Sequence, residues 1–230
     1  MKTNLDKIKE IAIMFLYLDP TYTDIKLPIF ISHPFFESSI LMDYETHEMY
    51  NIFENKEMFE KNRTMMKELI KKDKSAQSIF LMIRKPYQLT FFKYVKEYLS
   101  EKDFAKLLIS SWTLTEFNSN DKNVTKNEFI SWFKKANKYY MMDESEIKVF
   151  NDLPENITIY RGVGDRKYKN GISWTLDKEK AIWFSKRFDF HDKHVYQGMV
   201  SKNDILAYID QCNEQEIIVD PKTIKNIGEI

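Results

Sequence analysis

The distribution of glycine constrains the fold of this chain more than any other feature. All five glycines lie in the last third of the sequence, and none occurs before Gly162. Glycine marks tight strand connections and close backbone approaches, which helical packing does without. We therefore expect helices over roughly the first 150 residues and strands in the remainder, which makes the chain an α+β protein.

Helix start signals support this division. Ser100–Asp103 and Thr125–Glu128 each resemble a capping box, a hydroxyl followed three residues later by an acid. Pro86 suits the first turn of a helix that runs to Tyr98. From Glu128 to Tyr140, apolar residues recur on one helical stripe, namely Phe129, Ile130, Trp132, Phe133 and Ala136.

After residue 156 the hydrophobic period becomes that of strands. Short segments rich in β-branched and aromatic residues follow one another, bounded by polar residues or glycine. We expect strands at Ile157–Tyr160, Gly171–Thr175, His194–Val200, Ile205–Ile209 and Glu216–Val219, with one helix between them at Lys178–Lys186. This predicts a helical domain over residues 1–124 and a second domain over 125–230, in which leading helices precede a small antiparallel or mixed sheet at 153–230.

Charge and hydropathy argue against some classes of function. The 35 basic and 35 acidic side chains cancel, which disfavours a general electrostatic grip on nucleic acid or an anionic membrane. No apolar run approaches the roughly 20 residues of a membrane-spanning helix. We interpret Ile11–Leu18 as part of an amphipathic first helix that ends before Pro20, because charges interrupt it upstream and no small-residue cleavage site follows. We therefore expect a cytoplasmic protein.

Four short motifs in the β-rich part carry the functional hypothesis. In chain order they are Tyr160-Arg161-Gly162, Ser173-Trp174-Thr175, the helix end from Phe184 to Arg187, and Glu214-Gln215-Glu216. Each motif alone is unspecific, since Glu-x-Glu, for example, merely places two carboxylates on one face of a strand. Their order and spacing together are the informative feature.

In this order the motifs resemble those of the ADP-ribosyltransferase fold, in its arginine–serine–glutamate class, which includes the catalytic domains of clostridial binary toxins and related exoenzymes. That class has an aromatic-Arg-Gly strand end, a Ser-Thr-Ser strand and a Glu/Gln-x-Glu pair at the start of a late strand. The resemblance covers residues 153–230. Trp174 and Thr175 depart from the family pattern, which has Thr and Ser there. An arginine rather than a histidine at position 161 argues against the histidine–tyrosine–glutamate branch of the fold.

The resemblance implies NAD as co-substrate and assigns residues to it. Arg161 and Arg187 would hold the diphosphate, since guanidinium groups donate bidentate hydrogen bonds. Gly162 would let the backbone approach the nicotinamide amide, and Phe184 would stack on the nicotinamide ring. No metal is required.

The resemblance also assigns the chemistry to two glutamates. Glu216 would bind the ribose hydroxyl and stabilise an oxocarbenium-like transition state, with Ser173 holding Glu216 in place. Glu214 would orient and deprotonate the nucleophile. In the family, a glutamate in the first position of the pair accompanies modification of arginine, so the expected acceptor is an arginine of a target protein.

Other functions stay open at this point. Water as the acceptor would make the protein an NAD glycohydrolase. A catalytically inactive protein that keeps the fold and occludes a partner is a second class, although retention of the arginine, serine and both glutamates counts against it. A nucleic-acid-modifying member of the same fold is a third, weakened by the zero net charge but kept open by basic residues between Lys167 and Arg187. The excess of lysine over arginine suggests a bacterial or phage genome, where a toxin or effector would fit.

The sequence offers little for a metal site. His191 and His194 form a His-x-x-His pair in a charged turn, without a cysteine or a third ligand nearby. Cys212 is the only cysteine, so neither a disulfide framework nor a thiolate metal cluster is expected.

Overall fold

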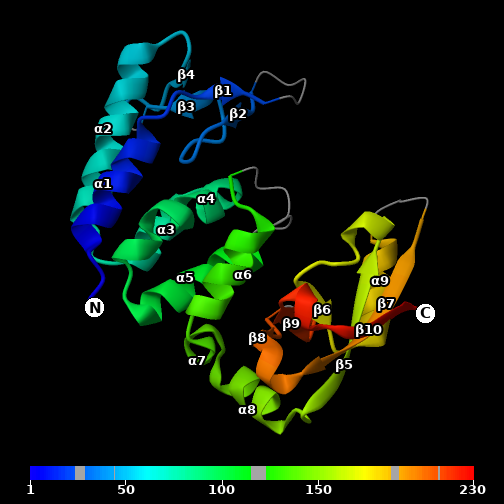
Figure 1. Cartoon of the computed structure of the whole chain (residues 1–230). Helices are drawn as coiled ribbons and strands as arrows, with labels where there is room; N and C mark the ends of the chain where they lie inside the picture. The colour runs from blue at the N-terminus through cyan, green and yellow to red at the C-terminus, as the bar shows by residue number, and fades with distance from the viewer. Residues whose placement is uncertain (24–28, 44, 115–122, 188–191, 212) are drawn as a thin grey trace. The chain divides into compact units, whose positions relative to one another are not determined.

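The computed structural model describes residues 1–23, 29–43, 45–114, 123–187, 192–211 and 213–230; His191 and Cys212 lie outside these ranges. The described elements form an α+β protein (Figure 1). The chain divides into two compact units, Met1–Val124 and Thr125–Ile230. Within the described ranges, no helix has both the length and the apolar character to cross a membrane.

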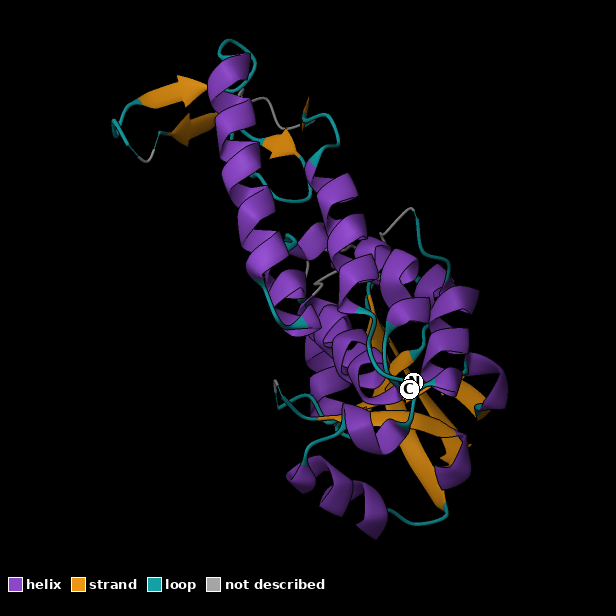
Figure 2. Cartoon of the chain, turned by 90° about the vertical axis from the view of Figure 1, so that its left-hand side faces the viewer, coloured by secondary structure: helices purple, strands orange, loops and turns teal. Residues whose placement is uncertain are grey.

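The first unit consists mainly of helices around an aromatic core. Its helices are α1 (Leu5–Leu16), α2 (Lys56–Lys72), α3 (Ala76–Met82), α4 (Lys85–Val95), the 3-10 turn η1 (Lys96–Tyr98) and α5 (Glu101–Leu114). Pro86 lies in the first turn of α4, as the sequence predicts. Phe91 is fully buried and meets Phe15 and Phe80 edge to face, an arrangement that aromatic pairs favour. Helices α1 and α2 lie side by side in both views (Figures 1 and 2).

Two short hairpins interrupt the first part, which the sequence predicts to be mostly helical. Strand β1 (Thr21–Tyr22) pairs with β2 (Ile31–Ser32), and β3 (Ile40–Met42) pairs with β4 (Met49–Asn51), both antiparallel. The β3–β4 connection does without glycine, because His47 adopts a φ of 60° and Asp43 accepts hydrogen bonds from the amides of Glu45 and Thr46. Aspartate and histidine can thus supply a turn, so lack of glycine did not exclude hairpins.

The second unit begins with three helices, α6 (Lys126–Lys135), α7 (Lys138–Met141) and α8 (Glu144–Asp152). The predicted capping box of Thr125 and Glu128 is present at the start of α6. The helix predicted over Glu128–Tyr140 is wrong as one element, because the backbone turns extended at Ala136 and the side chain of Asn137 caps a new helix. Asparagine competes with helical hydrogen bonding in this way.

A six-stranded antiparallel sheet follows, in the order β10-β7-β5-β6-β9-β8. Its elements are β5 (Asn156–Val163), η3 (Arg166–Tyr168), β6 (Ser173–Thr175), α9 (Lys178–Lys186), β7 (His194–Ser201), η4 (Lys202–Asp204), β8 (Ile205–Ile209), β9 (Glu216–Val219), η5 (Pro221–Thr223) and β10 (Lys225–Glu229). The sequence predicted α9, β8 and β9 with these bounds. It missed the edge strand β10, whose residues are mostly exposed and show no apolar alternation.

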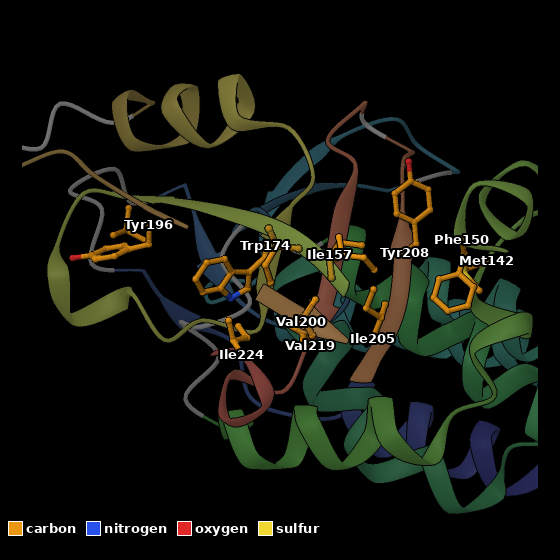
Figure 3. Packing of buried hydrophobic residues seen from close by; sticks show 13 residues of the cluster. Met142, Phe150, Ile157, Trp174, Tyr196, Val200, Ile205, Tyr208, Val219 and Ile224 are labelled. Atoms are coloured by element: carbon orange, nitrogen blue, oxygen red, sulfur yellow. The ribbon is translucent and has the colours of Figure 1, made fainter. Parts of the chain in front are cut away.

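The two faces of this sheet have different coverings. One face carries a buried cluster that includes Ile157, Trp174, Val200 and Val219, and Phe150 of α8 packs into it (Figure 3). Helix α9 packs on the opposite face: a Cβ on Gly162 would stand 1.7 Å from the carbonyl oxygen of Ala181. The candidate residues therefore have to be assigned to one face or the other.

Candidate functional site

Three neighbouring strands bring most of the predicted residues together. Arg161 and Gly162 lie near the end of β5, Ser173 begins β6, and Glu216 begins β9. The strands are adjacent in the order β5-β6-β9. Thr175 of β6 is opposite Tyr160 on one side and opposite Glu216 on the other. The predicted arginine, serine and second glutamate thus all lie within two residues of one row across the sheet.

Strand alternation separates their side chains onto two faces. Residues directly opposite each other in an antiparallel ladder point to the same face, and neighbours along a strand alternate. Ser173 and Glu216 therefore lie on the same face as Gly162, the face covered by α9. Arg161 lies on the face of the buried cluster, as does Tyr196, the residue opposite it on β7. The motifs alone do not predict this division, because strand register decides the face on which each side chain lies.

The guanidinium of Arg161 lies where β5 and β6 separate. The β5–β6 ladder has Tyr160 opposite Thr175, and Arg161 follows directly. Its Nε donates to the carbonyl oxygen of Tyr168 at 3.0 Å, and its Nη1 donates to the carbonyl oxygen of Ser173. Arg161 extends from one face of the sheet, and the side chain of Ser173 lies on the other face. The Arg161 guanidinium is nevertheless bound to the main chain of Ser173.

Burial and charge act on Arg161 in opposite directions. Burial lowers the pKa of Arg161 to about 10, while the negative charge of Glu216 acts to raise that pKa. The guanidinium thus remains charged at neutral pH. Gly171 makes room for it, since a Cβ on Gly171 would stand 2.2 Å from the Cζ and Nη2 of Arg161. A guanidinium can donate charge-assisted hydrogen bonds to an anion, and here its charge also acts on Glu216.

Glu214 lies on the loop between β8 and β9 and is half-buried. Burial raises the pKa of Glu214, while the positive charges of Arg187 and Lys180 act to lower it. A carboxylate with a raised pKa is a stronger base than an ordinary one. Glu214 is thus a candidate base that faces the cations of α9.

Helix α9 carries the remaining predicted residues. Phe184 is half-buried and meets Trp183 edge to face, with ring centroids 5.1 Å apart. Arg187 follows the helix end and is exposed; its guanidinium lies over the ring of Trp183 at 5.4 Å. Arg187 therefore contacts the outer surface of α9 in this structure, and its predicted role on a diphosphate stays a prediction. Gly162 has a structural role that the sequence did not indicate, because α9 fills the space beside it.

Four residues near the site were not predicted. Tyr168 and Gly171 shape the position of Arg161, while Thr175 and Asp210 bind the loop of Glu214. Tyr168 acts through its carbonyl oxygen, so its residue type gave no signal. Gly171 and Thr175 did give one: Gly171 is one of the few glycines, and Thr175 departs from the family motif.

The described residues contain no group of three or more His, Cys, Asp or Glu side chains that could hold a metal ion. His194 instead contacts Glu229, with its Nδ1 2.6 Å from a carboxylate oxygen. No protein-family model, no curated protein and no solved structure matches this chain. Function is therefore inferred from the motifs and from the geometry of this one site.

Proposed function

We propose that residues 125–230 form a catalytic domain of ADP-ribosyltransferase type, and that the protein transfers ADP-ribose from NAD to an arginine of a target protein. The observation that carries the proposal is the adjacency of β5, β6 and β9. It brings the charge of Arg161 to Glu216 and binds the Arg161 guanidinium to the main chain of Ser173. Glu214 lies two residues before Glu216, on the same side as the cations of α9.

The residues suit the reaction chemically. The bond between nicotinamide and ribose breaks, the electron pair leaves with nicotinamide, and the acceptor nitrogen bonds to the ribose carbon. Positive charge develops on the ribose, and the carboxylate of Glu216 would stabilise it. Glu214 would take the proton of the acceptor, since a neutral nitrogen attacks better than a cationic one. No described step needs a metal.

The surroundings of Arg161 fit an anionic substrate. Two of its nitrogens are bound by carbonyl oxygens of Tyr168 and Ser173 rather than by a carboxylate, so its positive charge is not neutralised by an ion pair at these contacts. Loss of hydration makes this half-buried cation costly unless it is compensated, and Glu216 compensates it only in part, since the pKa of Arg161 stays lowered. A diphosphate would compensate it, and this is the role that the resemblance assigns to Arg161.

Incubation of the full chain with adenylate-labelled NAD and a bacterial lysate tests the proposal. We expect a labelled protein band with the wild type and none with Glu216→Gln, which keeps the shape of the side chain but removes its charge. Glu155→Gln is the matched control, because Glu155 is an exposed glutamate of the same unit.

The other outcomes separate the remaining functions. Release of nicotinamide without a labelled macromolecule identifies an NAD glycohydrolase. Label that is removed by nuclease but not by protease identifies a nucleic-acid acceptor. If NAD neither reacts nor binds, as measured by calorimetry, the enzyme is refuted and an occluding binding protein is favoured.

A further inference from the structure

The hydroxyl of Thr175 joins two segments that are far apart in the sequence. Thr175 is 4% exposed. Its Oγ1 donates to the carbonyl oxygen of Glu214 at 2.6 Å and accepts from the amide of Asp177 at 3.0 Å. Asp177 in turn caps α9, with its side chain accepting from the amides of Glu179 and Lys180. One buried hydroxyl therefore links the main chain of Glu214 to the start of α9.

Further hydrogen bonds fix the same loop. The amide of Leu176 donates to the carbonyl oxygen of Gln215 at 3.1 Å. The amide of Gln215 donates to Oδ1 of Asp210 at 3.0 Å, and the amide of Asp210 donates to the carboxylate of Glu146 at 2.8 Å. The loop is thus bound on one side to β6 and on the other side to the start of α8.

The backbone on either side of Glu214 is in an unfavourable conformation. Asn213 has a φ of 53° and Gln215 has a φ of 45°, both in the left-handed region. Asparagine tolerates this region, whereas glutamine there costs about 1 kcal/mol or more. Local preference alone would not select this shape, so the hydrogen bonds to Thr175 and Asp210 must maintain it.

We propose that Thr175 is the positioning residue of Glu214, and that its hydroxyl sets how the enzyme divides its NAD between a protein acceptor and water. The inference rests on the proposed function, in which Glu214 prepares the acceptor and Glu216 acts on the ribose. Loss of the Thr175 contact would displace Glu214 but leave Glu216 in its β9 ladder. Transfer to protein should then fall more than hydrolysis of NAD.

The first test uses the full chain with Thr175→Val, which removes the hydroxyl, and Thr175→Ser, which retains it. We expect Thr175→Val to lower protein labelling by about tenfold or more, while nicotinamide release in the absence of lysate changes less than about twofold. Thr175→Ser should restore labelling, and Asp210→Ala should resemble Thr175→Val. The matched control is Thr158→Val, an exposed threonine on β5 of the same sheet.

The pH profile provides a readout that a purely structural role would not change. Burial raises the pKa of Glu214, so labelling by the wild type should fall as the pH drops through that raised value. In Thr175→Val the loop should be more hydrated, which lowers the pKa of Glu214. The fall in labelling should therefore occur at a lower pH than in the wild type. Equal loss of labelling and hydrolysis in folded Thr175→Val, or unchanged labelling, overturns the assignment.

Amide hydrogen exchange separates this inference from the proposed function. Thr175→Val removes the acceptor of the Asp177 amide directly, and it should weaken protection of the Gln215 amide by about tenfold, because the bond from Gln215 to Asp210 depends on the position of the loop. Thr158→Val should leave both unchanged. If exchange at the Gln215 amide is unaffected by Thr175→Val, the positioning role fails even in an active enzyme. If the wild type neither transfers nor hydrolyses, the proposed function fails, and the role of Glu214 fails with it.

Discussion

At the scale of single residues, the site depends on backbone oxygens as much as on side chains. Arg161 donates to the carbonyl oxygens of Tyr168 and Ser173, and the hydroxyl of Thr175 donates to that of Glu214. Any residue type supplies a carbonyl oxygen, so these contacts leave no mark in the sequence. The order of the motifs predicted that Arg161, Ser173 and Glu216 lie near the ends of strands. The separation of the Arg161 and Ser173 side chains onto two faces depends on strand register, which the motifs do not specify.

Gly171→Ala should change the function more than the stability. The new Cβ would meet the Cζ and Nη2 of Arg161 at 2.2 Å, and the far end of a flexible side chain can move away. We expect the free energy of unfolding to change by less than about 1 kcal/mol, while the dissociation constant for NAD rises by about tenfold or more because the guanidinium is displaced. Urea unfolding and calorimetry measure the two effects. Gly228→Ala, which meets nothing within 4 Å, is the control; an unchanged affinity would count against the role of Arg161.

His33 in the first unit should remain neutral in mild acid. Its Nδ1 accepts from the amides of Phe35 and Phe36 and its Nε2 contacts the carbonyl oxygen of Leu18, so Nε2 carries the proton. Burial lowers the pKa of His33 to about 4, and the charge of Arg63 adds to this. The folded pKa lies below the unfolded value of 6.5, so the stabilisation is complete above pH 6.5 and is lost as the pH falls toward 4.

The loss should reach about 3 kcal/mol in the free energy of unfolding of the first unit. Urea titrations at several pH values measure it, and His33→Gln should flatten the pH dependence because the variant has no group to titrate there. An NMR titration of the His33 ring with a midpoint near 6.5 would contradict the prediction.

At the scale of elements, α9 depends on one glycine. The helix packs against β5 where Gly162 lacks a side chain, with the main chain of Ala181 and Ser185 in the space a Cβ would take. The sequence predicted α9 and several strands because their apolar residues follow a clear period. It missed β10 and the hairpins of the first unit, because exposed or very short strands have no such pattern.

Gly162→Ala should destabilise the second unit strongly. The Cβ would stand 1.7 Å from the oxygen of Ala181 and 2.7 Å from the nitrogen of Ser185. Both are main-chain atoms, so the whole helix must shift, and we expect a cost of about 3 kcal/mol or more. Chemical unfolding measures the change in the free energy of unfolding, with Gly228→Ala as the control variant. A cost below about 1 kcal/mol would show that α9 adjusts easily.

At the scale of the whole molecule, the chain consists of two compact units with separate buried cores. In the first, helices surround packed phenylalanines such as Phe91; in the second, the sheet covers a cluster around Trp174. The change in glycine content indicated where the strands of the sheet begin, but it does not coincide with the boundary between the units, because the leading helices α6, α7 and α8 of the second unit also lack glycine. The proposed catalytic function depends on residues of the second unit alone.

Residues 125–230 should fold when expressed by themselves. Their core cluster and complete sheet are formed within the unit, which is the condition for independent folding. We expect one cooperative urea transition, with circular dichroism and tryptophan fluorescence giving the same midpoint. Two probes with different midpoints, or a broad non-cooperative change, would show that the first unit is needed for stability.

The contact between β5 and β6 has a mechanical consequence. On one side β7 pairs along the length of β5, and on the other β9 pairs along β6, but β5 and β6 themselves share the single register position of Tyr160 and Thr175. The sheet is therefore two ribbons joined at a seam. The ladder across that seam is short, so the buried side chains of Ile157 and Trp174 and the hydrogen bond from Arg161 to Ser173, more than main-chain pairing, keep the two ribbons joined.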